Sequence, residues 1–319
     1  MVHSRATFES DREMGAFSRS EREAGAFDAV LSALQAHPFK IHRPTEQRIP
    51  FVFASPHSGR LYPAGFAAQS RLDALSLRRS EDAYADALFS GTVGLGAPMI
   101  AARFPRAFLD ANRAPGELDA AMFDGALTVR IDAPNARVNA GLGVIPRIVR
   151  DGAEIYGSKL QPREASERLS RLHAPYHAAL ARLMDETLAR FGVAILIDCH
   201  TMPSAASVPD VVLGDRFGVA AAPMLTRLAE SAFERAGFSV TRNTPYAGGY
   251  TTHLYGRRED HVHALQIEIN RRLYLDEEHI ELGPNFALVQ SRLNQALAEI
   301  IAIDLDALGR ARPVPMAAE

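Results

Sequence analysis

Apolar runs of strand length alternate along the chain with segments that repeat at helical spacing. Residues 49–54 and 193–197 are apolar throughout, which is typical of strands buried on both faces of a sheet. Between them, leucines recur at roughly every 3.6 residues over 162–191, and Gly192 follows at a position where many helices end. This alternation predicts an α/β fold.

The remaining predicted elements continue the alternation. Ser80 is the expected N-cap of a helix at 81–89. Residues 114–160 are rich in Gly, Pro, Asn and Asp, so we expect long loops there with short hairpin pieces, and such insertions are often functional. Further strands are expected at 98–103, 211–213, 239–240 and 262–270, and further helices at 219–236 and 284–308.

The N-terminal segment carries an internal repeat. SDREMGAF at 10–17 closely matches SEREAGAF at 20–27. We interpret the repeat as a local duplication rather than a docking motif, and we assign it no chemistry. We expect residues 1–30 to form a mobile extension and residues 31–319 to form a single domain, because no linker divides them.

Composition argues against several classes of protein. The formal net charge of −3 provides no basic surface for nucleic acid. No apolar stretch approaches the roughly 18 residues of a transmembrane helix, and the N-terminal segment lacks the apolar core of a signal peptide. Cys199 is the single cysteine, so no internal disulfide can form. We therefore expect a cytoplasmic enzyme or binding protein with no nucleic-acid or membrane partner.

Two of the predicted strands end in a histidine. His57 and His200 each follow closely on an apolar run, and the carboxyl ends of neighbouring strands line one crevice in an open α/β sheet. A catalytic zinc takes about three ligands from His, Asp and Glu. Asp82 or Glu81 would supply the third ligand, although acids are also common at a helix start because they favour the helix dipole.

Glu268 is an acid inside an apolar strand, in the segment LQIEI at 265–269. An unpaired charge in such a place costs several kcal/mol, so the carboxylate must be paired or must have a function. Two hypotheses follow. Glu268 is either half of a buried ion pair with an arginine or a general base beside a metal-bound water.

A third polar cluster, RAFLDANR at 106–113, also follows a predicted strand. Arg106 and Arg113 carry guanidinium groups, which bind carboxylates through two parallel hydrogen bonds. Asn112 adds a group that can orient a polar substrate. The alternative is a set of weak surface salt bridges. The cluster favours a substrate that carries carboxylate groups.

Other reactive side chains are assigned to packing. His173 and His177 lie four residues apart on the long predicted helix, as metal ligands can, but Pro175 lies between them and no HExxH motif is present. Cys199 lies in an apolar strand, where a cysteine is more often inert than nucleophilic.

Together, several short motifs resemble those of the N-formylglutamate amidohydrolase (deformylase) family. The resemblance covers about 50–275, and the N-terminal extension and the details of 114–160 fall outside it. It implies a fold like that of zinc carboxypeptidases, a three-layer α/β/α sandwich with a mixed, mostly parallel central sheet of about eight strands. The matching pieces are SPHSG at 55–59, ED at 81–82, RAFLDANR at 106–113, PYH at 175–177, IDCHT at 197–201, GGYTTHLYG at 248–256 and HALQIEINRRLY at 263–274.

The resemblance also implies a metal and a base. It points to zinc held by His57, His200 and Asp82, with Glu81 left open as the acidic ligand. Glu268 matches the general base that takes a proton from the attacking water and returns it to the departing amine. Asp198, two residues before His200, is expected to orient a ligand.

The implied substrate site lies around the arginine cluster. Arg113, next to Asn112, matches the arginine that grips a substrate carboxylate, and Arg106 is the candidate for the developing oxyanion. The motif GGYTTH adds expected substrate contacts from Gly249, Tyr250, Thr252 and His253.

The implied reaction is zinc-dependent hydrolysis of N-formyl-L-glutamate to formate and glutamate, a step of histidine degradation. His253 departs from the family pattern, because the histidine-degradation enzymes tend to carry arginine there. Another N-acyl amino acid, or a peptide C-terminus as in metallocarboxypeptidases, is the alternative substrate. A non-catalytic zinc protein is a further alternative, which an intact Glu268 argues against.

Overall fold

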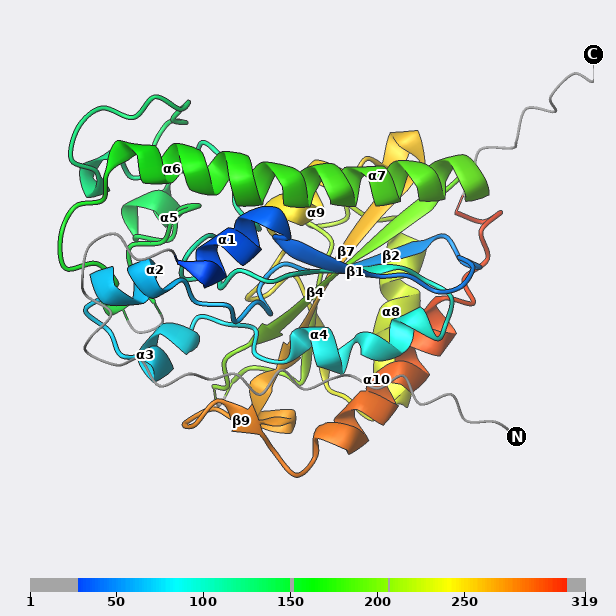
Figure 1. Cartoon of the computed structure of the whole chain (residues 1–319). Helices are drawn as coiled ribbons and strands as arrows, with labels where there is room; N and C mark the ends of the chain where they lie inside the picture. Colours follow the sequence, from blue (N-terminus) through cyan, green and yellow to red (C-terminus); the bar gives the residue numbers. More distant parts are fainter. Residues whose placement is uncertain (1–27, 150–151, 206, 309–319) are drawn as a thin grey trace, which may run out of the picture.

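A mixed sheet of seven strands lies at the centre of the structure (Figure 1). The computed structural model describes residues 28–149, 152–205 and 207–308, so the repeat at 10–27 lies outside the described residues. In spatial order the strands are β1 (Phe39–His42), β3 (Met99–Ala102), β2 (Phe51–Ser55), β4 (Ala194–Met202), β7 (Val262–Asn270), β5 (Val211–Gly214) and β6 (Val240–Arg242).

The pairing of these strands confirms a mixed, mostly parallel sheet. β3, β2, β4 and β7 run parallel to one another, whereas β1 and β5 join them antiparallel and β6 runs parallel to β5. The described residues place seven strands in the sheet, one fewer than the resemblance implies. A separate two-stranded ribbon is formed by β8 (Leu275–Asp276) and β9 (Glu281–Leu282).

Helices cover both faces of the sheet (Figure 1), which confirms the three-layer α/β/α arrangement. Within the described residues no helix is long and apolar enough to cross a membrane. The α-helices are α1 (Ala29–Ala36), α2 (Ala64–Gln69), α3 (Ala74–Arg78), α4 (Ala85–Leu88), α5 (Ala136–Asn139), α6 (Pro162–Arg168), α7 (Ala174–Phe191), α8 (Pro223–Arg235), α9 (Tyr250–Tyr255) and α10 (Phe286–Ile300).

Each face of the sheet buries its own apolar layer, because alternate side chains of a strand point to opposite faces. In β4, Ile195 and Ile197 pack in the cluster that includes α8 and α10. Ala194 and Leu196 pack in the cluster that includes α7. β4 is therefore apolar on both faces over most of its length, as the run 193–197 predicts.

The long predicted helix at 162–191 is confirmed, with one irregularity. α6 and α7 are joined by a π-helical turn over Leu169–His173, so the segment is continuous. Gly192 ends it in the left-handed conformation, at a φ of 72° that an L side chain rarely adopts.

Three predicted helices are shorter than expected, and the smallest difference is in the helix expected at 219–236, which is α8 (Pro223–Arg235). The helix expected at 81–89 is the single turn α4, because Tyr84 takes a left-handed φ of 61° just before it. Ser80 is not its N-cap and instead donates to the Leu77 carbonyl. The last helix ends at Ile300, not at 308. These changes matter for the site, since they leave Glu81 and Asp82 in a loop.

Candidate metal and catalytic site

The carboxyl ends of β4 and β7 present four polar side chains on one face of the sheet. Asp198 pairs in register with Gln266, and His200 pairs with Glu268. All four are at least nine-tenths buried. They continue the face that is apolar nearer the start of each strand, so the sheet itself sets their spacing.

His57 reaches the same place from the loop after β2. The loop lies against the backbone after β3, and a Cβ on Gly59 would lie 2.1 Å from the Phe104 carbonyl oxygen. Only glycine permits this approach. The His57 carbonyl accepts a hydrogen bond from the Asp82 amide (3.0 Å), which brings the two residues together.

His57, Asp82 and His200 converge as a candidate metal site. Their ligand atoms all lie within 4.8 Å of one another, and all three side chains are buried. Asp82 Oδ2 lies 2.7 Å from His200 Nδ1 and 3.3 Å from His57 Nδ1. The structure thus brings together the three residues that the motifs single out.

The far nitrogen of each imidazole faces a carboxylate. His57 Nε2 lies 2.7 Å from Asp110 Oδ1, and His200 Nε2 lies 3.1 Å from Asp198 Oδ2. The structure therefore places Asp198 where it contacts His200, as expected of a residue that orients this ring. A carboxylate beside Nε2 holds a proton on that nitrogen, so Nδ1, which faces Asp82 in both rings, is the nitrogen that would be free to bind a metal.

The donor set fits a divalent metal. His57 Nδ1 is buried and has no hydrogen-bond partner among the described residues, although Asp82 is close. Two imidazole nitrogens and one carboxylate oxygen, each imidazole backed by a carboxylate, match the ligand set of catalytic zinc sites.

In the metal-free protein, the negative charge of Asp82 and the positive charge of His200 stabilise each other. Burial would raise the pKa of Asp82, but the hydrogen bond with His200 and the attraction to His200 and His57 outweigh it and hold the pKa well below its usual range. Burial would lower the pKa of His200, but Asp198 and Asp82 outweigh that effect and raise it well above its usual range. In the metal-free protein, protonated His200 therefore supplies the positive charge beside Asp82, and a bound divalent cation would replace that charge.

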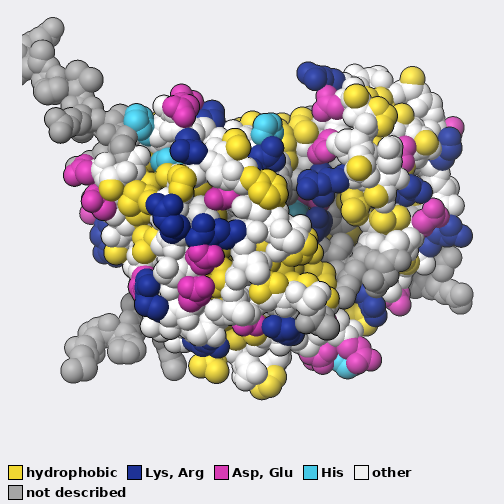
Figure 2. Space-filling view, turned by 180° about the vertical axis from the view of Figure 1, so that it is seen from behind, with side chains coloured by type: hydrophobic (Ala, Val, Ile, Leu, Met, Phe, Trp, Pro, Cys, Tyr) yellow, Lys and Arg dark blue, Asp and Glu magenta, His cyan; other side chains and the backbone are white. Residues whose placement is uncertain are grey.

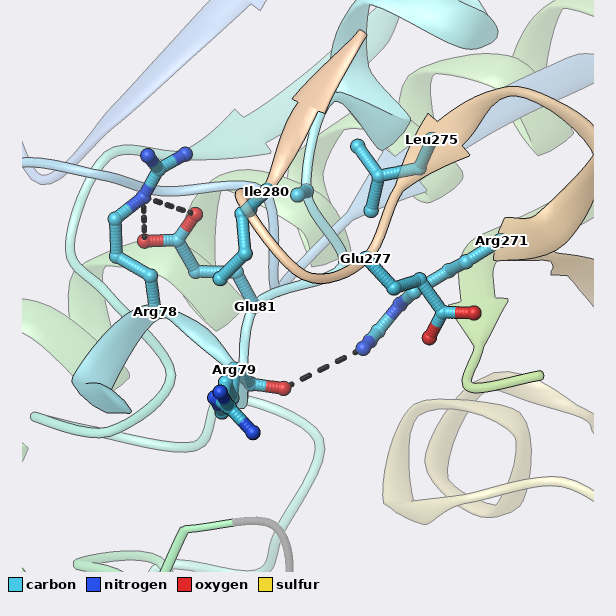
Figure 3. A pocket seen from close by; sticks show the side chains of 8 residues that line it. Arg78, Arg79, Glu81, Arg271, Leu275, Glu277 and Ile280 are labelled. Atoms are coloured by element: carbon cyan, nitrogen blue, oxygen red, sulfur yellow. Dashed lines mark hydrogen bonds and ion pairs between the residues drawn. The ribbon is translucent and has the colours of Figure 1, made fainter. Parts of the chain in front are cut away.

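Glu81 points away from the two histidines. Its carboxylate faces Arg78 Nε at 3.3 Å from each oxygen (Figure 3). Its Oε1 also accepts a hydrogen bond from the Tyr62 hydroxyl at 2.7 Å. The cavity that Arg78 and Glu81 help to line is only about 10 Å³, room for about one water. Of the two adjacent acids, Asp82 is the one that the structure places at the candidate metal site.

Arg271 is a site residue that sequence reasoning missed. Its Nη2 donates to Asp82 Oδ1 (3.0 Å), Nε donates to Thr201 Oγ1 (3.1 Å), and Nη1 reaches the Arg79 carbonyl (3.4 Å, Figure 3). One guanidinium therefore joins the loop that carries Asp82 to the end of β4. The available signal was its position directly after β7.

Glu268 has no ion-pair partner within the described residues, so the hypothesis of a buried pair with an arginine is wrong there. Its hydrogen-bond partner is Gln266, whose Nε2 donates to Glu268 Oε1 at 2.7 Å. Burial is the main cause that raises the pKa of Glu268 to about 7, and Asp82 adds to it. A carboxylate that titrates near neutrality can both accept and return a proton.

The arginine cluster lies beside these residues. Arg106 donates through Nε to Asp110 Oδ2 (3.0 Å), and its side chain keeps 29% of its exposure. Burial opposes its charge, but Asp110 and Asp82 outweigh burial and raise the pKa of Arg106. Arg113 is more deeply held, since it donates to the carbonyls of Leu142 (2.9 Å) and Asn112 (3.1 Å).

Both the oxygen and the nitrogen of the Asn112 side-chain amide contact protein groups. Its Oδ1 accepts from the Thr251 amide (2.8 Å), and its Nδ2 lies 3.4 Å from Asp198 Oδ2 and 3.1 Å from His200 Nε2. Since a backbone amide can only donate, the amide group must face this way. Asn112 thus links the turn at Gly249 to the candidate metal site.

The motif GGYTTH spans that turn and the start of α9. Gly249 donates its amide to Gln266 Oε1 (2.8 Å), and Thr252 is fully buried. The Tyr250 ring lies 5.4 Å from that of His177. His253 is exposed and makes no side-chain hydrogen bond or ion pair within the described residues.

The predicted packing role of His173 and His177 is confirmed. His173 Nε2 donates to the Arg113 carbonyl (2.9 Å), and His177 Nε2 donates to the Ala111 carbonyl (2.8 Å). The prediction that Cys199 is inert agrees with its complete burial, which raises the pKa of the thiol well above its usual range. Neither histidine lies in the candidate metal cluster.

Comparisons with known proteins point to one family. Residues 49–275 match the model of the family described as N-formylglutamate amidohydrolase. The chain is 31% identical over 245 residues to the N-formylglutamate deformylase of Pseudomonas aeruginosa, covering 72% of this chain and 84% of that protein. It is 30% identical over 243 residues to that of Pseudomonas putida, covering 72% and 83%.

Solved structures agree. The crystal structure of N-formylglutamate amidohydrolase from Ralstonia eutropha has 34% sequence identity and a TM-score of 0.78, covering 83% of this chain and 97% of that chain. A protein of Agrobacterium tumefaciens with 18% identity shares the fold at a TM-score of 0.63, covering 88% and 99%.

Proposed function

This chain belongs to the N-formylglutamate amidohydrolase family, and on that premise we propose that it uses a divalent metal, zinc, to hydrolyse N-formyl-L-glutamate to formate and glutamate. The observation that carries the proposal is the buried carboxylate of Glu268, which has no ion-pair partner among the described residues and lies in register with His200. A structural zinc site, closed by its own ligands, has no use for such a base.

His57, Asp82 and His200 would hold the metal. A divalent ion bound there supplies Lewis acidity toward a carbonyl oxygen and toward water. The chain's own part is to present Nδ1 of both imidazoles, which Asp110 and Asp198 do by holding the Nε2 protons.

Glu268 would move the proton. Its carboxylate takes a proton from the attacking water, whose oxygen bonds to the formyl carbon. When the carbon–nitrogen bond breaks, the same carboxyl group returns that proton to the departing amine. In the metal-free protein, burial raises the pKa of Glu268 to about 7, so the site leaves this carboxyl group able to carry a proton.

The arginines support an acidic substrate. Arg106 remains cationic and partly exposed, so its free N–H groups can meet the developing oxyanion. Arg113 is the candidate for a substrate carboxylate, with Tyr250, Thr252 and His253 as further candidate contacts. Figure 2 shows a depression between two raised parts of the surface, with Lys and Arg side chains at its edge.

We further propose a cytoplasmic enzyme of histidine degradation. A single cysteine, Cys199, buried in β4, fits a reducing cytoplasm. Glutamate and formate as products fit a role in histidine degradation.

The test is a comparison of substrates and metals on the full chain. Protein stripped by a chelator and then reloaded with zinc should release formate from N-formyl-L-glutamate, and the stripped protein should not. N-acetyl-L-glutamate, N-succinyl-L-glutamate, N-formyl-L-leucine and a peptide with a free C-terminus should react at least about tenfold more slowly in kcat/KM. Equal or faster turnover of the peptide would favour a carboxypeptidase-like activity, and no turnover of any substrate would overturn the proposal.

A further inference from the structure

Gln266 makes two hydrogen bonds that join a backbone turn to the proposed base. Its Oε1 accepts from the Gly249 amide at 2.8 Å, and its Nε2 donates to Glu268 Oε1 at 2.7 Å. The side chain is buried, with 4% of its surface exposed. Gln266 and Glu268 are two residues apart on β7, so they lie on the same face of the strand.

The direction of the Gln266 amide is set by the turn. A backbone N–H can only donate, so the oxygen of the side-chain amide must face Gly249. The nitrogen is then left facing Glu268 and can only donate to it. The pair is thus a hydrogen bond from a neutral donor to a carboxylate, which favours the ionised form.

The turn itself has little freedom to move. A Cβ on Gly249 would lie 2.4 to 2.6 Å from the side-chain amide of Asn112, so only glycine fits there. Two residues later, the Thr251 amide donates to Asn112 Oδ1. The turn is therefore held between Asn112, next to His200, and Gln266, next to Glu268.

Resting on the proposed function, we propose that Gln266 is a positioning residue for the base Glu268. It occupies one carboxylate oxygen and so orients the other, which accepts no hydrogen bond within the described residues, toward the water to be activated. It also opposes protonation of Glu268 in a buried site. The other charges that act on Glu268 come from His200, Asp82, Arg106 and Arg271, and none of them bonds to it directly.

Two substitutions separate the two hydrogen bonds. Gln266→Glu keeps an acceptor for the Gly249 amide but replaces the donor to Glu268 by a second carboxylate. Gln266→Met, of similar size, removes both. The matched control is Gln47→Met, since Gln47 donates to the carbonyls of Ile49 and Phe51 and to Thr187 Oγ1, and it precedes β2 at the other end of the sheet.

The expected readout is a shift of the pH profile in the zinc-loaded protein. Gln266→Glu should move the acid limb of kcat/KM upward by about one pH unit or more, because a like charge beside Glu268 raises its pKa. Gln266→Met should lower kcat about ten- to a hundredfold with KM little changed. Zinc content should stay at the wild-type level in both, and Gln47→Met should alter melting temperature alone.

A second measurement does not depend on turnover. The pKa of Glu268 can be followed by carbon-13 NMR of its carboxyl carbon in the zinc-loaded full chain, with the signal assigned by its loss in Glu268→Gln. Gln266→Met should raise that pKa, and Gln47→Met should not. An unchanged pKa, or a Gln266→Glu profile that matches the wild type, would overturn the proposal. If the pKa shifts but no variant or wild type releases formate, the proposed function fails while the positioning contact stands.

Discussion

The molecule contains two buried pairs of histidines that look alike at close range. The rings of His57 and His200 have centroids 4.8 Å apart, and those of His173 and His177 have centroids 4.5 Å apart. In the first pair, His57 lies in the loop after β2 and His200 lies near the carboxyl end of β4. The second pair lies on α7 and the π-helical turn before it. Proximity of two imidazoles therefore does not identify a metal site.

The partners of the rings distinguish the two pairs. His57 and His200 each have a carboxylate beside both ring nitrogens, and their Nδ1 atoms converge on Asp82. His173 and His177 donate to backbone carbonyls, and burial lowers the pKa of His177 to about 3. The second pair is neutral, and its N–H groups hold the backbone of 111–113 in place.

The largest effect should come from removing a member of the first pair. His200→Ala and His57→Ala should each lose bound zinc and nearly all activity, because a site with three ligands rarely survives the loss of one. The measurement is zinc per chain by elemental analysis, together with formate release. His173→Asn serves as the control and should keep its zinc. Stoichiometric zinc in either alanine variant would refute the ligand assignment.

The next effect should come from the base beside the first pair. Glu268→Gln should lower kcat by roughly 10²–10⁴, the usual contribution of general acid–base catalysis, with KM little changed. Zinc analysis and steady-state kinetics on the folded variant test it. Glu81→Gln is a matched control, since Glu81 is a buried acid paired with Arg78, and it should lose stability rather than chemistry. A near-normal kcat in Glu268→Gln would contradict the mechanism.

In the metal-free protein, Glu268→Gln should increase the unfolding free energy relative to the wild type at neutral and higher pH. The folded pKa of Glu268, about 7, lies above its ordinary value of 4.5, so the folded state binds the proton more tightly. The unfolding free energy of the wild type should therefore fall, relative to Glu268→Gln, as pH rises between these values. The total is about 3 kcal/mol and is constant above the folded pKa.

Chemical denaturation in chelator, from about pH 5 to about pH 8, measures this difference between the two proteins. Parallel stability curves across that range would show that Glu268 is not held at a raised pKa.

A smaller effect on activity is expected from substitution of Arg113, whose backbone carbonyl accepts the hydrogen bond from His173. Arg113→Ala should raise KM for N-formyl-L-glutamate about ten- to a hundredfold, since a charge-assisted hydrogen bond contributes roughly 1.5–3 kcal/mol. A neutral substrate such as N-formyl-L-leucine should be affected much less. Equal losses on both substrates would mean that Arg113 shapes the site but does not bind the carboxylate.

The smallest effect should come from the second histidine pair. His177→Phe removes the N–H that donates to the Ala111 carbonyl and should lower the unfolding free energy by about 1–3 kcal/mol. Zinc content should not change. Thermal or urea denaturation with zinc analysis checks both statements, and loss of zinc in this variant would show that the two pairs are not independent.

The sequence predicts the strand-borne half of the site more readily than the loop-borne half. His200 and Glu268 stand out because a polar or charged side chain interrupts an apolar strand, and Gln266 carried the same signal two residues earlier. Asp82 and Glu81 could not be separated from sequence, because they are adjacent acids. What separates them is the left-handed Tyr84 and the contacts of Glu81 with Arg78 and Tyr62, which are tertiary.

The fold shows the same division. The leucine spacing predicts the long helix at 162–191, and the apolar run at 193–197 predicts the first part of β4, which continues to Met202. Burial of apolar side chains determines both of these features. The helix at 81–89 failed because capping residues and acids suggested a helix that the backbone at Tyr84 does not allow. Asp110 and Arg271 contact His57 and Asp82 across distant segments of the chain, and no local pattern in the sequence shows which residues they will contact.

The candidate metal site joins two central strands, β4 and β7, to two connecting loops, and these parts of the protein should differ in local unfolding. His200 and Glu268 sit on central parallel strands, which belong to the parts of a protein that exchange their amide hydrogens last. His57 and Asp82 sit on connecting loops, which open far more readily. A bound metal would fasten those loops to the sheet, so its arrival should slow hydrogen exchange in the loops while leaving the strands as slow as before.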